Sequence, residues 1–234
     1  MDTNTFNNLI SQTWPDLHAA STLGGGTFGT VYACTKTDAV TGVTQKEAVK
    51  VVRVDFTPED RANAEEEGIP FADYYRAVKE KRLQEIRWMV ALKSPHIVHI
   101  NGYTAIEEPD HSALYILIRM DRLTTLDQLR PAHLNDTPEQ AAALAEKVAL
   151  DICDALRVCH QNGVLHRDIK PANILCSDAG NFYLGDFGIS KGTAQQASMT
   201  SSGTLEYAPR EVMTGQYAVS YTHLRAHETL ANLV

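Results

Sequence analysis

A short polar stretch near residue 170 constrains this chain more than any other, since it reads HRDIKPAN over residues 166–173 and an Asp-Phe-Gly soon follows. A carboxylate such as Asp168 can orient a hydroxyl nucleophile and accept its proton. Asn173 and Asp186 offer the oxygen ligands that Mg²⁺ prefers, with coordination positions left for phosphate and water. Lys170 adds positive charge where a migrating phosphoryl group spreads its negative charge. The spacing therefore indicates phosphoryl-transfer chemistry at a metal ion, although each residue alone is more often a solvated or capping side chain.

A glycine-rich stretch lies upstream, with Gly24, Gly26 and Gly29 in the spacing G-x-G-x-x-G. Dinucleotide-binding folds use the same spacing before a helix. Here residues 30–35 are rich in β-branched and aromatic side chains, so we expect the glycines to join two strands. Such a flap can lie close over a triphosphate with its amides facing the phosphate oxygens. A glycine-rich hairpin without a ligand is the alternative.

The next segments alternate between strand and helix patterns. An apolar strand expected over residues 48–54 carries Lys50 at its centre, either buried with a partner or on an edge that faces water. Residues 55–71 are acidic and rich in helix breakers, which predicts a solvated loop or a short helix. Apolar residues at helical spacing then predict a helix from about residue 72 to 92, and a nearly all-apolar run predicts a buried strand over 114–118.

Local signals define the elements around the polar stretch. The sequence TPEQ at 137–140 has a capping-box pattern with proline in the first turn, so it predicts the start of a long helix that ends at Asn162 and Gly163. Residues 174–176 and 182–184 predict a hairpin that carries Asp186.

Together these motifs resemble those of eukaryotic-type (Hanks-type) serine/threonine protein kinases, whose catalytic loop and DFG motif follow in this order. The resemblance implies an α+β, bilobal protein kinase-like fold. A small antiparallel β lobe with helix C would precede an incomplete, mainly α-helical large lobe. We expect a flexible leader (1–16), a small lobe (17–120) with the 55–71 insertion, a partial large lobe (121–218) and a non-native tail (219–234).

The resemblance ends near Ala218, and the following residues resemble translated sequencing-adapter read-through. Helix F and everything after it in the family would be missing, which leaves apolar surface uncovered. We therefore expect a fragment, poorly soluble or inactive as it stands.

The resemblance also implies roles for individual residues. Asp168 would be the catalytic base and Lys170 the charge stabiliser, while Asn173 and Asp186 hold Mg²⁺ or Mn²⁺. Lys50 would hold the α- and β-phosphates of ATP and pair with Glu85, with Glu80 as the fallback. The expected nucleotide site comprises Gly24, Gly26, Thr27, Phe28, Gly29, Val31, Ala48, Lys50, Ile118, Arg119, Asp121 and Leu175.

Within that site the resemblance implies which residues enclose the adenine and which part of the main chain recognises it. Val31 and Ala48 would cover the adenine from above and Leu175 from below. Ile118 would be the gatekeeper, and residues 119–121 the hinge whose main chain reads the adenine edge. The unusual side chains of the hinge, Arg119 and Asp121, need not disturb this reading.

Two further groups follow from the resemblance. His166, Phe187, Met89 and Ile100 would stack into the spine that aligns the lobes. The segment after the DFG motif would carry phosphorylation sites sensed by Arg167, or be an unmodified loop. Its expected residues are Ser198, Thr200, Ser201 and Ser202 for phosphorylation, with Thr204 and Glu211 for peptide docking; Thr204 and Lys170 indicate a serine or threonine acceptor.

Composition limits the partners. The net charge of −8 argues against nucleic acid or an anionic membrane as the main partner, and no apolar run has membrane-spanning length. The four cysteines lack metal-ligand spacing, which fits a reduced, cytoplasmic setting. We expect protein substrates bearing serine or threonine and leave the oligomeric state open. The alternatives are a pseudokinase, acting as a nucleotide-binding scaffold, and a small-molecule kinase of the aminoglycoside phosphotransferase type.

Overall fold

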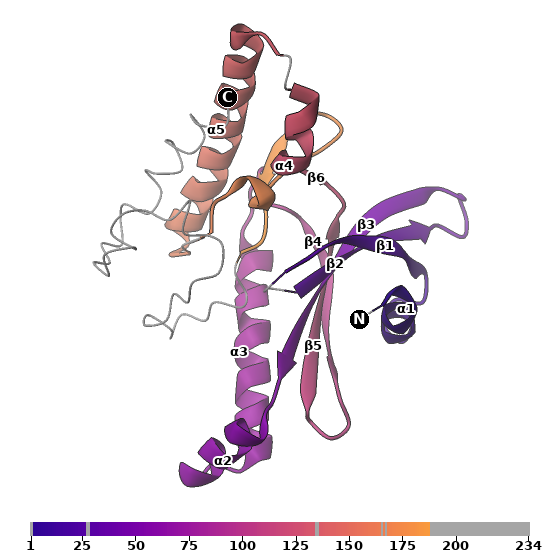
Figure 1. Ribbon diagram of the computed structural model, residues 1–234, viewed down its shortest axis with the longest axis vertical. Helices are drawn as coiled ribbons and strands as arrows, with labels where there is room; N and C mark the ends of the chain where they lie inside the picture. The colour runs from indigo at the N-terminus through magenta and orange to yellow at the C-terminus, as the bar shows by residue number, and fades with distance from the viewer. Residues whose placement is uncertain (1, 27–28, 134–135, 165, 167, 188–234) are drawn as a thin grey trace. The chain divides into compact units, whose positions relative to one another are not determined.

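The chain forms two compact units, each with its own sheet and its own core (Figure 1). The first comprises residues 1–90 and 99–122, and the second residues 91–98 and 123–234. The computed structural model describes residues 2–26, 29–133, 136–164, 166 and 168–187.

The first unit is built on a five-stranded sheet in the order β1-β2-β3-β5-β4, in which every neighbouring pair is antiparallel. The strands expected over 48–54 and 114–118 are confirmed, and both are longer than the apolar runs that predicted them. The strands are β1 (Leu17–Gly26), β2 (Gly29–Thr37), β3 (Thr44–Asp55), β4 (Ile100–Glu107) and β5 (Ala113–Asp121).

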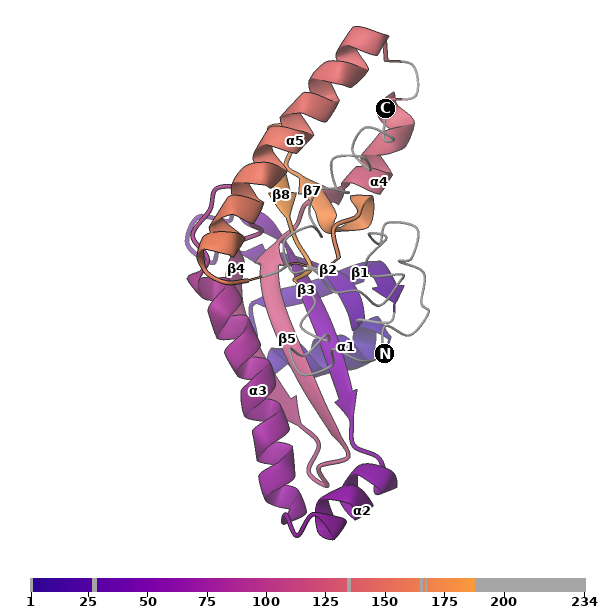
Figure 2. The same ribbon diagram turned by 90° about the vertical axis from the view of Figure 1, so that its left-hand side faces the viewer.

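Two helices lie between β3 and β4 in the chain. The acidic insertion forms the short helix α2 (Pro58–Glu66), which Thr57 and Asp60 cap with a reciprocal capping box. The predicted helix C is confirmed as α3 (Phe71–Ala91). It lies along one side of the sheet, and the N-terminal helix α1 (Thr3–Ser11) lies on the other side (Figures 1 and 2).

The flexible leader expected over residues 1–16 is wrong, because residues Thr3–Ser11 form α1. Phe6 and Ile10 are both 0% exposed, and the Phe6 ring stacks on Tyr32 of β2 with centroids 3.9 Å apart. Asp2 caps the helix by accepting two backbone N–H groups at 2.9 Å. This helix covers the sheet face made by residues such as Tyr32, Val49, Val51 and Leu117.

The second unit combines a long helix with a small sheet. Helix α5 (Pro138–Gln161) begins at Thr137 with the predicted capping box, and Gly163 just beyond its end has a φ of +70°. The sheet has the order β6-β7-β8. Its strands are β6 (Thr124–Thr125), β7 (Ile174–Cys176) and β8 (Phe182–Leu184), and the short helices are α4 (Leu126–Leu129), η1 (Arg130–His133) and η2 (Pro171–Asn173).

The buried stripe of α5 packs against the β7–β8 hairpin, whose strand bounds agree with the prediction. Val148, Ile152, Leu156 and Cys159 form this stripe. Figure 2 shows α5 beside the two strands. The hairpin is therefore held on a rigid helical support.

Residues 91–98 join the second unit, although the sequence places them in the small lobe. Leu92 and Ile97 are buried in the core of the second unit, and a pair of backbone hydrogen bonds joins the segment to β8. Val98 N–H donates to Leu184 O at 3.0 Å, and Leu184 N–H donates to His96 O at 2.8 Å.

All four cysteines are free thiols. Burial raises the pKa of Cys34 and of Cys159 to about 11. Among the described residues, no helix combines the length and apolar character that crossing a membrane requires.

Candidate active site

The central strands of the first unit place Lys50 on a face with three of the expected nucleotide residues. Lys50 lies on β3 in register with Val31 of β2 and Ile118 of β5. Antiparallel partners point to the same side of a sheet, and so do residues two apart along a strand, so Ala48 shares this face. Lys50 is 7% exposed, which excludes the edge-strand alternative. We call this surface the Lys50 face.

The glycine-rich stretch joins two strands, as predicted, and opens no helix. β1 ends at Gly26 and β2 begins at Gly29, and these two residues pair across the hairpin. Gly29 has a φ of +119°, and a Cβ atom there would overlap the carbonyl oxygen of Val51. Only glycine fits this position. Thr27 and Phe28 lie outside the described residues.

Glu85 lies on α3, in the same unit as Lys50, and its side chain is 13% exposed. Within the described residues its ion-pair partner is Arg82, at 3.3 Å from Oε2, and Oε1 is buried without a hydrogen-bond partner. Burial raises the pKa of the Glu85 carboxyl, and the nearby Arg82 partly offsets this. The expected pair with Lys50 stays a prediction.

The hinge residues continue β5 to its end. Arg119 pairs with Val49 of β3 and with Gly102 of β4, and Asp121 pairs with Glu47. Because side chains alternate along a strand, Arg119 and Asp121 point away from the Lys50 face. The unusual hinge side chains are therefore directed to the opposite face of the sheet.

In the second unit, the HRDIKPAN stretch brings three predicted catalytic residues into contact. The Nζ atom of Lys170 lies 3.1 Å from Oδ2 of Asp168. Asn173 Nδ2 donates to the same Oδ2 at 3.0 Å and to the Asp168 carbonyl at 2.7 Å. Asp168 and Asn173 are both buried. The single turn η2 makes these contacts possible, since it folds Asn173 back onto Asp168.

His166 connects this cluster to the segment before Asp186. Its Nδ1 accepts the Asp168 N–H at 3.4 Å, so its Nε2 carries the proton and donates to Gly185 O at 2.7 Å. The His166 ring also meets Phe187 edge-on, with centroids 4.8 Å apart. This is the half of the expected spine that the second unit contains; the part formed by Met89 and Ile100 stays a prediction.

Gly185 fixes where Asp186 leaves the hairpin. Its N–H donates to Asn173 O at 2.9 Å, and a Cβ atom on it would overlap the side chain of Leu175. Asp186 itself has a φ of +52°, a conformation that few non-glycine residues adopt. Such backbone strain is concentrated at functional sites. Leu175, the expected floor of the adenine site, thus lies directly against the segment that carries Asp186.

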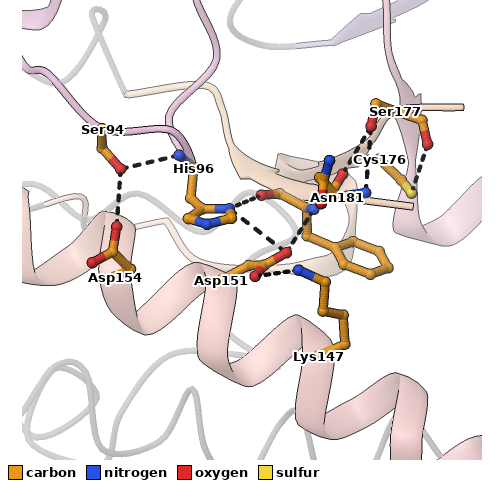
Figure 3. A network of polar contacts seen from close by, with 9 residues as sticks. Ser94, His96, Lys147, Asp151, Asp154, Cys176, Ser177 and Asn181 are labelled. Atoms are coloured by element: carbon orange, nitrogen blue, oxygen red, sulfur yellow. Dashed lines mark hydrogen bonds and ion pairs between the residues drawn. The ribbon is translucent and has the colours of Figure 1, made fainter. Parts of the chain in front are cut away.

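A polar network anchors the same hairpin to α5 (Figure 3). The buried carboxylate of Asp151 accepts the Phe182 N–H at 3.0 Å and the Lys147 ammonium at 2.7 Å. His96 Nδ1 lies 3.0 Å from Phe182 O and 3.6 Å from Asp151. Ser94 donates to Asp154 at 3.4 Å, one turn further along α5. The backbone leading to Asp186 is therefore fixed by buried polar contacts as well as by apolar packing.

The second unit contains oxygen donors of the kind that Mg²⁺ prefers. The Nδ2 atom of Asn173 is directed at Asp168, so its amide oxygen points away from that residue. The Asp186 carboxylate is the second oxygen donor of the predicted metal site, and Mg²⁺ is commonly bound by one or two protein ligands plus phosphate and water. Among the described residues, no group of three or more His, Cys, Asp or Glu could hold a metal ion.

Some of the predicted contacts would join residues of different units, and some of the predicted residues lie outside the described part of the chain. Lys50 belongs to the first unit, whereas Asn173 and Asp186 belong to the second; their convergence on one nucleotide stays a prediction. The peptide-docking and phosphorylation residues, and the phosphate-sensing arginine, lie outside the described residues. They are Arg167, Ser198, Thr200, Ser201, Ser202, Thr204 and Glu211.

The sequence did not predict two buried residues that hydrogen-bond to the segments carrying the site. Asp151 and Glu47 are both buried, and each contacts a segment that carries predicted site residues. The α5 periodicity contains no signal for Asp151 beyond a charged residue within an apolar stripe. For Glu47 the available signal was Arg119, a charge in a nearly all-apolar strand that requires a partner.

Comparisons with known proteins agree with this geometry. A protein-family model, the protein kinase domain, matches residues 17–223. Aurora kinase B of Xenopus tropicalis is 27% identical over 222 residues, which cover 92% of this chain and 54% of that protein. Aurora kinase B of Drosophila melanogaster is 35% identical over 138 residues, 59% of this chain and 40% of that protein.

A bacterial relative matches as well. The serine/threonine-protein kinase PknH of Mycobacterium bovis is 29% identical over 187 residues, covering 80% of this chain and 26% of that protein. The chain thus spans about half the length, or less, of these relatives. Since the protein kinase domain model matches most of its residues, the chain belongs to the protein kinase family.

Proposed function

We propose that the protein transfers the γ-phosphoryl group of Mg-ATP to serine or threonine hydroxyls of proteins. The observation that carries this proposal is the buried cluster in which Lys170 and Asn173 both contact Oδ2 of Asp168. The acceptor class is supported by Lys170 and Thr204 in the sequence and by relatives that are named as serine/threonine kinases.

In the proposed reaction the Asp168 carboxylate orients the acceptor hydroxyl and receives its proton. A bond forms between the acceptor oxygen and the γ-phosphorus, and the bond from that phosphorus to the β–γ bridging oxygen breaks, which releases ADP. Lys170, held beside Asp168, stabilises the negative charge on the transferred group. When bound, Mg²⁺ neutralises phosphate charge, and Asn173 and Asp186 would hold it. Lys50 and Glu85 would orient the α- and β-phosphates.

The test follows phosphoryl transfer from γ-labelled ATP to a generic basic protein. Asp168→Asn keeps the side-chain size but removes the base, so transfer should fall by at least about 100-fold. Asp178→Asn is the matched control, since Asp178 is an exposed residue of the β7–β8 turn. It should leave transfer unchanged.

Three outcomes would contradict the proposal in different ways. Transfer that survives Asp168→Asn would show that Asp168 is not the base. Binding of Mg-ATP without transfer would identify a nucleotide-binding scaffold. Transfer to aminoglycosides in preference to proteins would identify a small-molecule kinase. Measurable turnover by the unaltered 234-residue chain is the baseline for these comparisons, and it would overturn the expectation that the chain is inactive.

A further inference from the structure

The end of β5 carries a charged side chain, Arg119, that is hydrogen-bonded to the neighbouring strand β3. Arg119 donates two hydrogen bonds to the carboxylate of Glu47, one from Nη2 to Oε1 at 2.7 Å and one from Nε to Oε2. The Glu47 side chain is 7% exposed and that of Arg119 13%. The pair is therefore a bidentate ion pair largely removed from water, which joins β3 to β5 across the sheet.

The N-terminal segment encloses the same arginine. The guanidinium carbon of Arg119 lies 6.0 Å from the centre of the Trp14 ring. Trp14 lies over the next position in the row, Gly102, where an added Cβ atom would be in ordinary contact with the indole at 3.7 Å. Hydrogen bonds from Arg119 to Glu47 raise the pKa of the guanidinium further. Arg119 is thus held by a carboxylate and lies beside an aromatic ring.

Asp121, the second polar side chain of the hinge, is also hydrogen-bonded. Asp121 accepts a hydrogen bond from Asn101 Nδ2 at 3.0 Å, and Asn101 Oδ1 lies 2.7 Å from Nδ1 of His99. Across the sheet, Asp121 pairs directly with Glu47. Two carboxylates opposite each other repel, and the Arg119 charge and the Asn101 amide offset this repulsion.

We propose that Glu47 is a positioning residue, which holds the hinge backbone at 119–121 in place through Arg119 and so sets the affinity for the adenine base. The inference rests on the proposed function, because it concerns the main chain that would read adenine. Side chains alternate along β5, so a displacement of Arg119 also moves its neighbours Ile118 and Met120 on the Lys50 face. Loss of the Glu47 charge removes the carboxylate to which the nearly buried guanidinium is hydrogen-bonded and leaves the weaker influence of Asp16, so Arg119 must then move toward water.

The test separates recognition of the base from recognition of the phosphates. Calorimetry measures binding of Mg-ATP and of magnesium with inorganic tripolyphosphate, which carries no base. Glu47→Gln should weaken Mg-ATP binding about tenfold and tripolyphosphate binding less than about twofold. In steady-state kinetics the KM for ATP should rise while kcat stays the same.

Two further variants test the Glu47–Arg119 pair by other changes. Arg119→Lys retains the charge but loses the planar fork, so it should show the same selective loss to a smaller degree; it also serves if Glu47→Gln fails to fold. Exchange of the two charges, Glu47→Arg with Arg119→Glu, should restore most of the ATP affinity. Asp55→Asn is the control, since it breaks the exposed Arg53–Asp55 pair at the other end of β3.

Each outcome decides the inference. Equal weakening of both ligands would show that the Glu47–Arg119 pair only stabilises the fold, and unchanged ATP affinity would show that it does not position the hinge. If the unaltered protein binds tripolyphosphate but does not prefer ATP, the inference fails while the phosphate site stands. If it binds neither ligand, the proposed function itself fails, and the inference with it.

Discussion

Glu85 is a residue whose ionised form destabilises the folded protein. One of its carboxylate oxygens is buried without a hydrogen-bond partner among the described residues, and burial raises its pKa. An acid whose pKa is higher in the folded state binds protons more tightly there than in the unfolded chain. The contribution of Glu85 to the free energy of unfolding is therefore greatest at low pH, and it falls as pH rises from the ordinary pKa of the group through the raised one.

The destabilisation by the ionised Glu85 carboxylate should disappear when its charge is removed. Glu85→Gln should raise the free energy of unfolding at pH 7 by about 1 kcal/mol, because a buried charge without a full set of partners is replaced by a neutral amide. At about pH 4, where the unfolded acid is largely protonated, the difference should become small. Denaturant titrations at the two pH values measure both effects.

The matched control is Glu80→Gln on the same helix, since Glu80 is exposed and pairs with Arg87 on the surface. Its effect on stability should stay within about 0.5 kcal/mol. A Glu85 variant that is less stable than the parent at pH 7 would contradict the prediction. If Glu85 also orients Lys50, the stabilised variant should bind Mg-ATP more weakly.

At the scale of single residues, contacts between residues close in the sequence can be predicted from their spacing, whereas contacts across strands cannot. The contacts among Asp168, Lys170 and Asn173 follow from one turn of chain, so their grouping could be inferred from the sequence. The partner of Arg119 could not, because Glu47 lies on another strand and only the register brings the two together. A one-residue slip in that register would put Glu47 on the opposite face.

Among the elements, α5 and α1 show why some helices are predictable. Helix α5 has its start and end signals in its own sequence, with Thr137 and Gln140 at one end and Gly163 beyond the other. Helix α1 has only nine residues, which is too short to be stable alone, and its apolar face is small. It forms because Phe6 and Ile10 are buried against the sheet, a contact that no local pattern specifies.

Helix α1 is therefore expected to contribute to stability as part of the first unit. Phe6→Ala removes a fully buried ring stacked on Tyr32, so the free energy of unfolding should fall by about 3–5 kcal/mol. Asn8→Ala, at an exposed position of the same helix, is the control and should change little. Chemical denaturation measures both, and a Phe6 variant as stable as the parent would restore the flexible-leader interpretation.

For the whole molecule, the nucleotide site can be tested without phosphoryl transfer. A ligand that binds only the folded state stabilises it by mass action, by about 2.7 kcal/mol at 100 times the Kd. Mg-ATP at that excess should raise the Tm by several degrees, and removal of Mg²⁺ with EDTA should abolish most of the shift. Differential scanning fluorimetry provides the measurement.

Lys50→Met and Lys46→Met form a matched pair for this experiment, since both lysines lie on β3 but Lys50 is buried and Lys46 exposed. The Mg-ATP shift should be lost in the first variant and kept in the second. A full shift in Lys50→Met would mean that the nucleotide does not bind at the Lys50 face.

The motif order in the sequence predicted a sheet-rich unit followed by a helical one, and the family assignment agrees. It did not predict that residues 91–98 belong to the second unit, since this depends on hydrogen bonds to β8, far along the chain. Membership of that segment is decided by long-range pairing and not by its own composition.

The chain passes from one unit to the other after Val90, Val98 and Arg122. No single cut in the gene can therefore release either unit with all of its parts. A polypeptide that stops at Arg122 keeps residues 91–98 without the hairpin to which they bond, and one that begins at Leu123 lacks them. During synthesis, the ribosome must deliver β8 before the segment that precedes β4 has its final partner.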